Sequence, residues 1–344
     1  MTDLFTAVLV AVSALLSWLM VALVRRYALR HLVDLPNERS SHEQPTPRGG
    51  GLGITLVHLG SVSLAAIFAV VPLDLWAALV GGGVIVAAIG FMDDHGHVNP
   101  TARLACHFSV FVWALWWLGG LPPVDFGWGP VSLGWTGTGL LLLYLAWFLN
   151  LFNFMDGIDG IAGVQAVTMS ATAALLIAVS GGDWREVLPL WLLVAATSGF
   201  LLWNWPPAQI FMGDVGSGYL GYALGVLALW TVVEGWLTLW VWLILGGAFL
   251  ADATVTLVVR ARSGVRVTTA HRSHAYQRLS RHWRSHRRVT TGLLLVNVFW
   301  LAPLAWVAAT RPTLGASTAV IALVPLFWAA ARIGAGHPGD IAAC

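Results

Sequence analysis

The sequence predicts an all-α polytopic membrane protein. Of its 344 residues, 58% are hydrophobic and only 10% are charged, and the mean hydropathy is +0.77. An ordinary soluble domain carries roughly 25% charged residues, so a soluble fold of this length could not cover its surface. A disordered chain is excluded because too much apolar surface would be left in water. Since lipid permits only helices or closed barrels, we expect one helical membrane domain over residues 1–344.

Eleven apolar segments follow one another with few polar residues between them. About 20 apolar residues are needed to cross a bilayer as a helix. The first segment lacks the charged start and the cleavage site of a signal peptide, so we expect it to be retained. Glycine clusters inside two segments are interpreted as close helix-packing surfaces. The expected transmembrane helices run near 3–24, 51–71, 75–92, 104–121, 136–154, 161–181, 186–203, 217–234, 236–259, 290–310 and 315–331.

The positions of the arginines predict the orientation. The chain has no lysine, and 16 of its 18 arginines fall on one side if alternate loops share that side. The positive-inside rule places this side in the cytoplasm, with the N-terminus outside and the C-terminus inside. The protein is therefore expected in the inner (plasma) membrane, and its net charge of +2 suggests no nucleic-acid partner. The expected cytoplasmic loops lie near 25–50, 93–103, 155–160, 204–216 and 260–289.

Acidic and amide side chains gather on the predicted cytoplasmic side. They are Asp93, Asp94, Asn150, Asn153, Asp156, Asp159, Asn204 and Asp214. Adjacent acids repel one another unless a cation or a proton lies between them. Hard divalent cations prefer oxygen ligands, and Mg²⁺ uses one or two carboxylates together with substrate phosphates. This pattern predicts a site for a divalent cation at the cytoplasmic face.

Simpler interpretations exist for the individual motifs. Asp93-Asp94 alone could be a solvated helix end, and Asp214 could be a helix N-cap. The His/Arg segment 271–288 suits phosphate oxygens, but its second half could equally contact anionic lipid headgroups. The string Asn153-Phe-Met-Asp156-Gly-Ile-Asp159-Gly, which enters an apolar span, fits a simple loop poorly.

The combined motifs indicate an enzyme that acts on a lipid. Acids would hold a divalent metal, basic groups would face phosphates, and the membrane would hold the lipid acceptor. The P-loop, serine-hydrolase and HExxH signatures are missing. A polytopic membrane transporter is the alternative, and it would place its polar pathway near the bilayer midplane. A CDP-alcohol phosphotransferase would need an arginine that the string DGIDGIAG lacks.

Five strings occur in a fixed order over roughly residues 34–280: PTPRGGG, GFMDD, NFMDGIDGIAG, FMGDVGS and HRSHAYQRL. On these strings the chain resembles the polyprenyl-phosphate N-acetylhexosamine-1-phosphate transferases of glycosyltransferase family 4, the WecA-, MraY- and WbpL-like enzymes. The resemblance implies transfer of an N-acetylated amino sugar-1-phosphate from a UDP-sugar to polyprenyl (undecaprenyl) phosphate, with release of UMP. It also implies a role at the start of lipid-linked glycan synthesis, such as O-antigen, capsule or cell-wall polysaccharide.

The resemblance also implies roles for individual residues. Asp214 would be the main ligand of Mg²⁺ (or Mn²⁺), helped by Asn153. Asp93 would deprotonate the lipid phosphate, with Asp94 and His274 as further catalytic groups. The implied substrate-binding residues are Asp156, Asp159, Asn204, Arg272, Arg48 and His42.

Several points stay open at the level of the sequence. His42 stands where MraY-type relatives have a lysine, and His274-Ala275-Tyr276 stands where several members have a histidine triplet. Asp252, an acid inside the ninth span, could be functional or could anchor a polar helix contact. No residue pattern identifies the sugar. A homodimer, and either single or double displacement, is compatible with the sequence.

Overall fold

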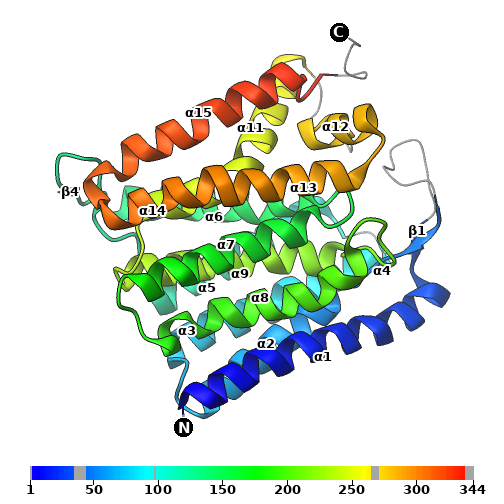
Figure 1. The fold of residues 1–344 in the computed structure, drawn as a ribbon, viewed down its shortest axis with the longest axis horizontal. Helices are drawn as coiled ribbons and strands as arrows, with labels where there is room; N and C mark the ends of the chain where they lie inside the picture. The colour runs from blue at the N-terminus through cyan, green and yellow to red at the C-terminus, as the bar shows by residue number, and fades with distance from the viewer. Residues whose placement is uncertain (1, 35–43, 97, 265–270, 338–344) are drawn as a thin grey trace.

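The computed structural model describes residues 2–34, 44–96, 98–264 and 271–337. In this part, helices run side by side in a bundle, with two ribbons of two short strands (Figure 1). The first half comprises α1 (Thr2–His31), β1 (Val33–Asp34), β2 (Thr46–Pro47), α2 (Gly51–Ile67), α3 (Leu73–Trp76), π-helix η1 (Ala77–Gly81), α4 (Gly82–His95), α5 (Pro100–Leu118), β3 (Val124–Asp125), β4 (Pro130–Val131) and α6 (Gly134–Met155). The second half comprises α7 (Ile161–Val179), α8 (Trp184–Asn204), α9 (Asp214–Val233), α10 (Leu239–Leu245), α11 (Gly247–Arg262), α12 (Ala275–Trp283), α13 (His286–Val296), π-helix η2 (Asn297–Leu301), α14 (Ala302–Thr310), 3₁₀-helix η3 (Pro312–Leu314) and α15 (Gly315–Ile333).

The all-α polytopic membrane class is confirmed. Among the described residues, eight helical stretches are long and apolar enough to cross a membrane, and the bent pair α10–α11 makes a ninth if it counts as one span. The helix α2, with 17 residues, is shorter than these. A count of eleven spans and the orientation of the termini therefore stay predictions.

Helix α9 forms the centre of the bundle. In its most apolar stretch 89% of the residues are buried, against 22% in α1 and 28% in the stretch that contains α15. Its glycines permit this position, because a Cβ at Gly221 would lie 2.7 Å from the Leu149 Cα in α6. The glycine cluster at 81–83, in the third predicted span, also allows close packing against α9. A Cβ at Gly83 would lie 3.0 Å from the Tyr219 ring of α9. Small residues thus let helices α4 and α6 approach α9 closely.

The expected span 236–259 is broken rather than continuous. α10 and α11 meet at Gly246 with a bend of 73°. A break of this kind frees backbone carbonyls that must find partners inside the protein. Here the Gln165 amide of α7 donates to the Leu245 carbonyl (2.9 Å), and Asn297 donates to the Gln165 Oε1 (2.9 Å). Buried amides on two neighbouring helices therefore give the end of α10 its polar partner at the bend.

The ribbon after α1 connects to the loop before α9. In this ribbon Val33 pairs with Pro47, and Asp34 with Thr46. The Phe211 backbone N–H donates to the Pro47 carbonyl (2.8 Å), and the Gly50 N–H donates back to the Phe211 carbonyl (2.9 Å). These bonds hold the start of α2 beside the start of α9 at one end of the bundle.

Candidate active site

Asp94 caps the N-terminus of α9. Its Oδ1 accepts from the Asp214 N–H (3.0 Å) and its Oδ2 from the Val215 N–H (3.1 Å). Gly213, with φ of +77°, brings the loop so close that a Cβ there would lie 2.7 Å from the Asp94 Oδ2. The Asp94 side chain is 3% exposed, and the Arg48 Nε lies 3.9 Å from its Oδ1. Asp94 therefore orients Asp214 through the backbone of α9.

Arg103 links two of the acids. Its Nη1 lies 2.6 Å from the Asp93 Oδ2 and 3.6 Å from the Asp214 Oδ2. The other carboxylate oxygen of Asp93 accepts from the Val98 N–H (2.9 Å). Arg103 was not among the predicted site residues. Its position ten residues after Asp93, across the turn from α4 to α5, was the only sequence signal for this pairing.

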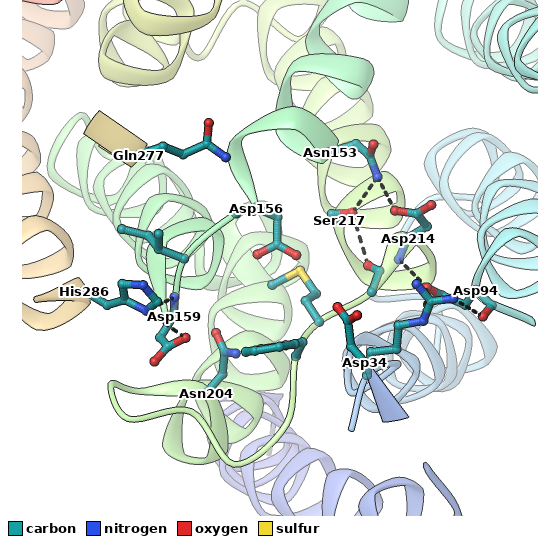
Figure 2. A pocket seen from close by; sticks show the side chains of 16 residues that line it. Asp34, Asp94, Asn153, Asp156, Asp159, Asn204, Asp214, Ser217, Gln277 and His286 are labelled. Atoms are coloured by element: carbon teal, nitrogen blue, oxygen red, sulfur yellow. Dashed lines mark hydrogen bonds and ion pairs between the residues drawn. The ribbon is translucent and has the colours of Figure 1, made fainter. Parts of the chain in front are cut away.

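Asn153 and Ser217 complete the surroundings of Asp214. The Asn153 Nδ2 donates to the Asp214 Oδ1 (2.7 Å) and to the Ser217 Oγ (3.0 Å), and Ser217 donates to the Gly213 carbonyl (3.1 Å). Figure 2 shows these side chains on one side of a shared cavity. Asn153 comes from the last turn of α6 and Asp214 from the first turn of α9, so the crossing of these helices brings the pair together.

The cavity has a volume of about 300 Å³ and lies at the ends of several helices. Asp156 projects into it in Figure 2. Burial, followed by the charges of Asp214, Asp94 and Asp159, raises the pKa of Asp156 well above its usual range. Acids that disfavour one another's charged forms create a site that attracts cations. The lining residues are Asp34, Arg48, Asp94, Asn153, Asp156, Gly157, Ile158, Asp159, Asn204, Phe211, Met212, Gly213, Asp214, Ser217, Gln277 and His286.

Asp159 and Asn204 form the far side of the cavity. The Asp159 Oδ1 lies 3.1 Å from the His286 Nδ1, and its Oδ2 accepts from the Ala208 N–H (3.0 Å). Asn204 is 3% exposed; its Oδ1 accepts from the Gly160 N–H (2.8 Å) and its Nδ2 donates to the Ile210 carbonyl (2.8 Å). Asn204 thus ties the start of α7 to the loop before α9. His286, at the first turn of α13, was missed by the sequence analysis.

A second, basic cavity of about 920 Å³ adjoins the first. The two cavities share Asp159, Phe211 and His286 in their linings. Arg281, Arg284 and Arg287 line the second cavity. The structure thus places a cationic region directly beside the carboxylate-lined one.

Three predicted residues lie outside the first cavity. His274 is buried, 3% exposed, and its Nδ1 lies 3.1 Å from the Asp252 Oδ1. Arg272 is exposed, and its carbonyl accepts from the Arg281 Nη1 (3.0 Å). Asp93 adjoins the cavity through Arg103 without lining it. His42 lies outside the described residues. The remaining predicted residues, Asp94, Asn153, Asp156, Asp159, Asn204, Asp214 and Arg48, all line the cavity.

The donor set fits Mg²⁺ only together with oxygen atoms from a substrate. Within the described ranges, no three His, Cys, Asp or Glu side chains are arranged as a ligand set. Asp214 offers a partly exposed carboxylate and Asn153 an amide beside it. Mg²⁺ commonly takes one or two protein carboxylates and completes its octahedron with water and phosphate oxygens. Asp214 and Asn153 would therefore hold the ion from one side.

The fold and the site define a polytopic membrane protein with a carboxylate-lined cavity at one end of its helix bundle. Residues 76–232 match the model of the family described as glycosyl transferase family 4. A phospho-N-acetylmuramoyl-pentapeptide-transferase of Gluconobacter oxydans is 30% identical over 67% of this chain and 71% of its own length. The chain belongs to glycosyl transferase family 4.

Other relatives cover more of the chain. A probable undecaprenyl-phosphate N-acetylglucosaminyl 1-phosphate transferase of Bacillus subtilis is 28% identical over 83% of this chain and 80% of its own length. A decaprenyl-phosphate N-acetylglucosaminephosphotransferase of Mycolicibacterium smegmatis is 29% identical over 87% of this chain and 80% of its own length. The similarity thus extends well beyond the segment that matches the family model.

Proposed function

We propose that this protein transfers an N-acetylhexosamine-1-phosphate from a UDP-sugar to polyprenyl phosphate and releases UMP. The observation that carries the proposal is the convergence of Asp94, Asn153, Asp156, Asp159 and Asp214 around one cavity at the helix ends. The names of the relatives, which specify undecaprenyl or decaprenyl phosphate, support the same reaction class.

In this proposal an oxygen of the lipid phosphate attacks the β-phosphorus of the UDP-sugar. The bond from that phosphorus to the bridging oxygen breaks, UMP leaves, and a polyprenyl-diphosphate-sugar forms. A single displacement is favoured, because the contacts of Asp214 with Asn153 and Arg103 hold it in a position that suits a metal ligand better than a free nucleophile. A bound Mg²⁺ would neutralise phosphate charge during the transfer.

The protein's own residues would bind, orient and move a proton. Asp93 would take the proton of the lipid phosphate, and to do so it must exchange its contact with Arg103 for the phosphate. Arg103 and Arg48 would then face phosphate oxygens, which suits their planar donors. Asp159, held by His286 and by the Ala208 N–H, would face the nucleoside.

The proposal includes the orientation predicted from arginine. Eleven spans would place the cavity at the cytoplasmic face, where a nucleotide-sugar is available, and the bilayer would supply the lipid acceptor. A transporter would instead need a polar pathway near the midplane. The acids that line the cavity come from helix ends and adjoining loops, an arrangement that favours the enzyme.

The reaction is tested with the purified protein in lipid nanodiscs. Undecaprenyl phosphate, Mg²⁺ and a panel of UDP-N-acetylhexosamines, including the GlcNAc, FucNAc and QuiNAc donors, are supplied, and UMP and lipid-linked sugar are measured. We expect equal amounts of both products with at least one donor, and none after chelation of Mg²⁺. Failure with every donor, together with uptake of nucleotide-sugar into protein-containing vesicles, would support the transporter instead.

A further inference from the structure

Asp252 is buried in α11 and accepts hydrogen bonds from two elements. Its Oδ1 accepts from the Thr256 hydroxyl (3.1 Å), the His274 Nδ1 (3.1 Å) and the Ala275 N–H (2.9 Å). Its Oδ2 accepts from the Tyr276 N–H (2.9 Å). The residue is 6% exposed. A buried carboxylate is costly unless it is fully hydrogen-bonded, and these donors meet that requirement.

The same contacts fix the first turn of α12. The Ala275 and Tyr276 amides belong to the N-terminus of α12, where backbone N–H groups have no partner within the helix. A negative charge at this end is also favoured by the helix dipole. Asp252 therefore joins α11 to α12 by charge and by hydrogen bonds. His274, the residue before α12, is oriented by the same carboxylate through its Nδ1.

The first turn of α12 places Gln277 in the lining of the carboxylate-lined cavity, and Tyr276 ties this turn to the end of α6. The Tyr276 hydroxyl donates to the Phe154 carbonyl (3.1 Å), and Gln277 lines the cavity. Gly157 makes room for them, because a Cβ there would clash with the Tyr276 hydroxyl and lie 3.0 Å from the Gln277 Nε2. In Figure 2, Gln277 and Asp94 lie on opposite sides of the cavity, with Asp156 between them.

The opposite sides of the cavity differ in chemistry. The Asp94 and Asp214 side carries charge and suits a metal ion with phosphates, whereas the Gln277 amide donates and accepts hydrogen bonds without charge. An uncharged polar group, such as a hydroxyl or the acetamido group of an amino sugar, suits the Gln277 side. The position of α12 would then affect donor binding more than lipid binding.

We propose that Asp252 is a positioning residue that holds α12 against the cavity, so that Gln277, in a turn that Tyr276 ties to the end of α6, faces the sugar of the donor. The inference rests on the proposed function for the identity of the donor. It concerns a segment beyond residues 76–232, which match the family model. The α10–α11 break is consistent with it, because the Gln165 amide, held by Asn297, bonds to Leu245 at the end of α10, directly before the helix that carries Asp252.

The test compares Asp252→Asn with the wild type in nanodiscs. An asparagine keeps the size of the side chain but turns one acceptor into a donor, which opposes the Ala275 or the Tyr276 amide. We expect the KM for UDP-N-acetylglucosamine, or for the best donor of the panel, to rise on the order of tenfold. The KM for undecaprenyl phosphate should stay within about twofold. Hydrogen exchange at the Ala275 and Tyr276 amides should become faster.

Two further variants separate positioning from general loss of fold. Tyr276→Phe removes the bond to Phe154 and leaves Asp252 intact, so a smaller rise of the donor KM is expected. Asp183→Asn makes the same chemical change at the N-cap of α8, an exposed position, and should change neither KM. The proposal is overturned if the folded Asp252→Asn variant keeps the wild-type KM for the donor. It is also overturned if hydrogen exchange at the Ala275 and Tyr276 amides of α12 is unchanged.

Failure of the proposed function gives a different result. If the wild-type protein releases no UMP from any donor, the proposed reaction is wrong. The hydrogen-exchange experiment then still decides whether Asp252 holds α12. If the wild type is active and Asp252→Asn alters both KM values equally, the reaction stands and the specific role of Asp252 is wrong.

Discussion

At the scale of residues, two neighbouring acids have different surroundings. Asp94 is buried and binds the backbone amides of Asp214 and Val215, whereas Asp93 pairs with Arg103. The sequence alone could not separate them, because the direction of each side chain depends on where α9 and α5 lie. Asp94 is not a solvated helix end, because it is buried, caps the N-terminus of α9 and lines the cavity.

Asp214 is the residue whose loss should affect activity most. We expect Asp214→Asn to lower kcat/KM on the order of 100-fold and to weaken the response to Mg²⁺, because a neutral amide binds the ion poorly. The measurement is UMP release over a Mg²⁺ titration. Asp183→Asn serves as the matched control and should behave like the wild type. Full activity and an unchanged Mg²⁺ response in Asp214→Asn would contradict the metal assignment.

His271 should make the protein sensitive to acid. Burial, with the nearby charges of His274 and Arg260, lowers the pKa of His271 from 6.5 to about 4. Between pH 6.5 and about pH 4, His271 binds a proton in the unfolded chain but not in the folded chain. The free energy of unfolding therefore falls as the pH drops through this range. We expect His271→Gln to reduce the loss of Tm between pH 7 and pH 5 by about 2–4 °C. If the wild type and His271→Gln lose the same Tm between pH 7 and pH 5, His271 is not the source of the acid sensitivity.

At the scale of elements, α9 can occupy the centre because glycines face its neighbours. A Cβ at Gly221 would meet the backbone of α6, which cannot move aside as a flexible side chain can. The composition indicates close packing in general. Which glycine faces which helix follows only from the assembled bundle.

Gly221→Ala should therefore destabilise the bundle. Overpacking of this kind costs about 1–3 kcal/mol, and the Tm in nanodiscs should fall accordingly. Gly139→Ala is the control in α6, because no atom lies within 4 Å of its would-be Cβ. That variant should keep or slightly raise the Tm, since alanine favours the helix. A Tm loss of equal size in both variants would contradict the packing argument.

The segment 260–289 illustrates what sequence patterns leave out at this scale. Its basic residues predict a cytoplasmic loop, yet the structure contains the helix α12 there. Three of the four donors to Asp252 come from His274 and the first turn of that helix, 22 to 24 residues later in the chain. The sequence left open that Asp252 anchors a polar contact between helices. The structure shows this contact, between α11 and α12.

At the scale of the whole molecule, the bundle brings distant chain segments to one end. The arginine-derived topology predicted that the acids would share one face, and seven of the predicted residues line one cavity. The orientation of that face in the membrane remains a prediction of the arginine count.

The orientation can be tested by labelling single cysteines. In a background with Cys106 and Cys344 replaced by serine, we introduce Arg284→Cys beside the basic cavity and Trp135→Cys at the start of α6. A membrane-impermeant maleimide added to intact cells should label position 135 and not position 284, because only the former is expected outside. After the cells are opened, both should react. Labelling of position 284 in intact cells would reverse the orientation.

The sequence by itself determined that the protein is a helical membrane protein, and it identified most of the acids and amides that meet at the site. These properties are local: hydropathy acts over about 20 residues, and each motif lies within a single segment. The tertiary structure decided the partners, namely Arg103 with Asp93, His286 with Asp159, and Asp252 with α12. Such pairings depend on how separate helices pack against one another, and a sequence motif within one segment does not specify that packing.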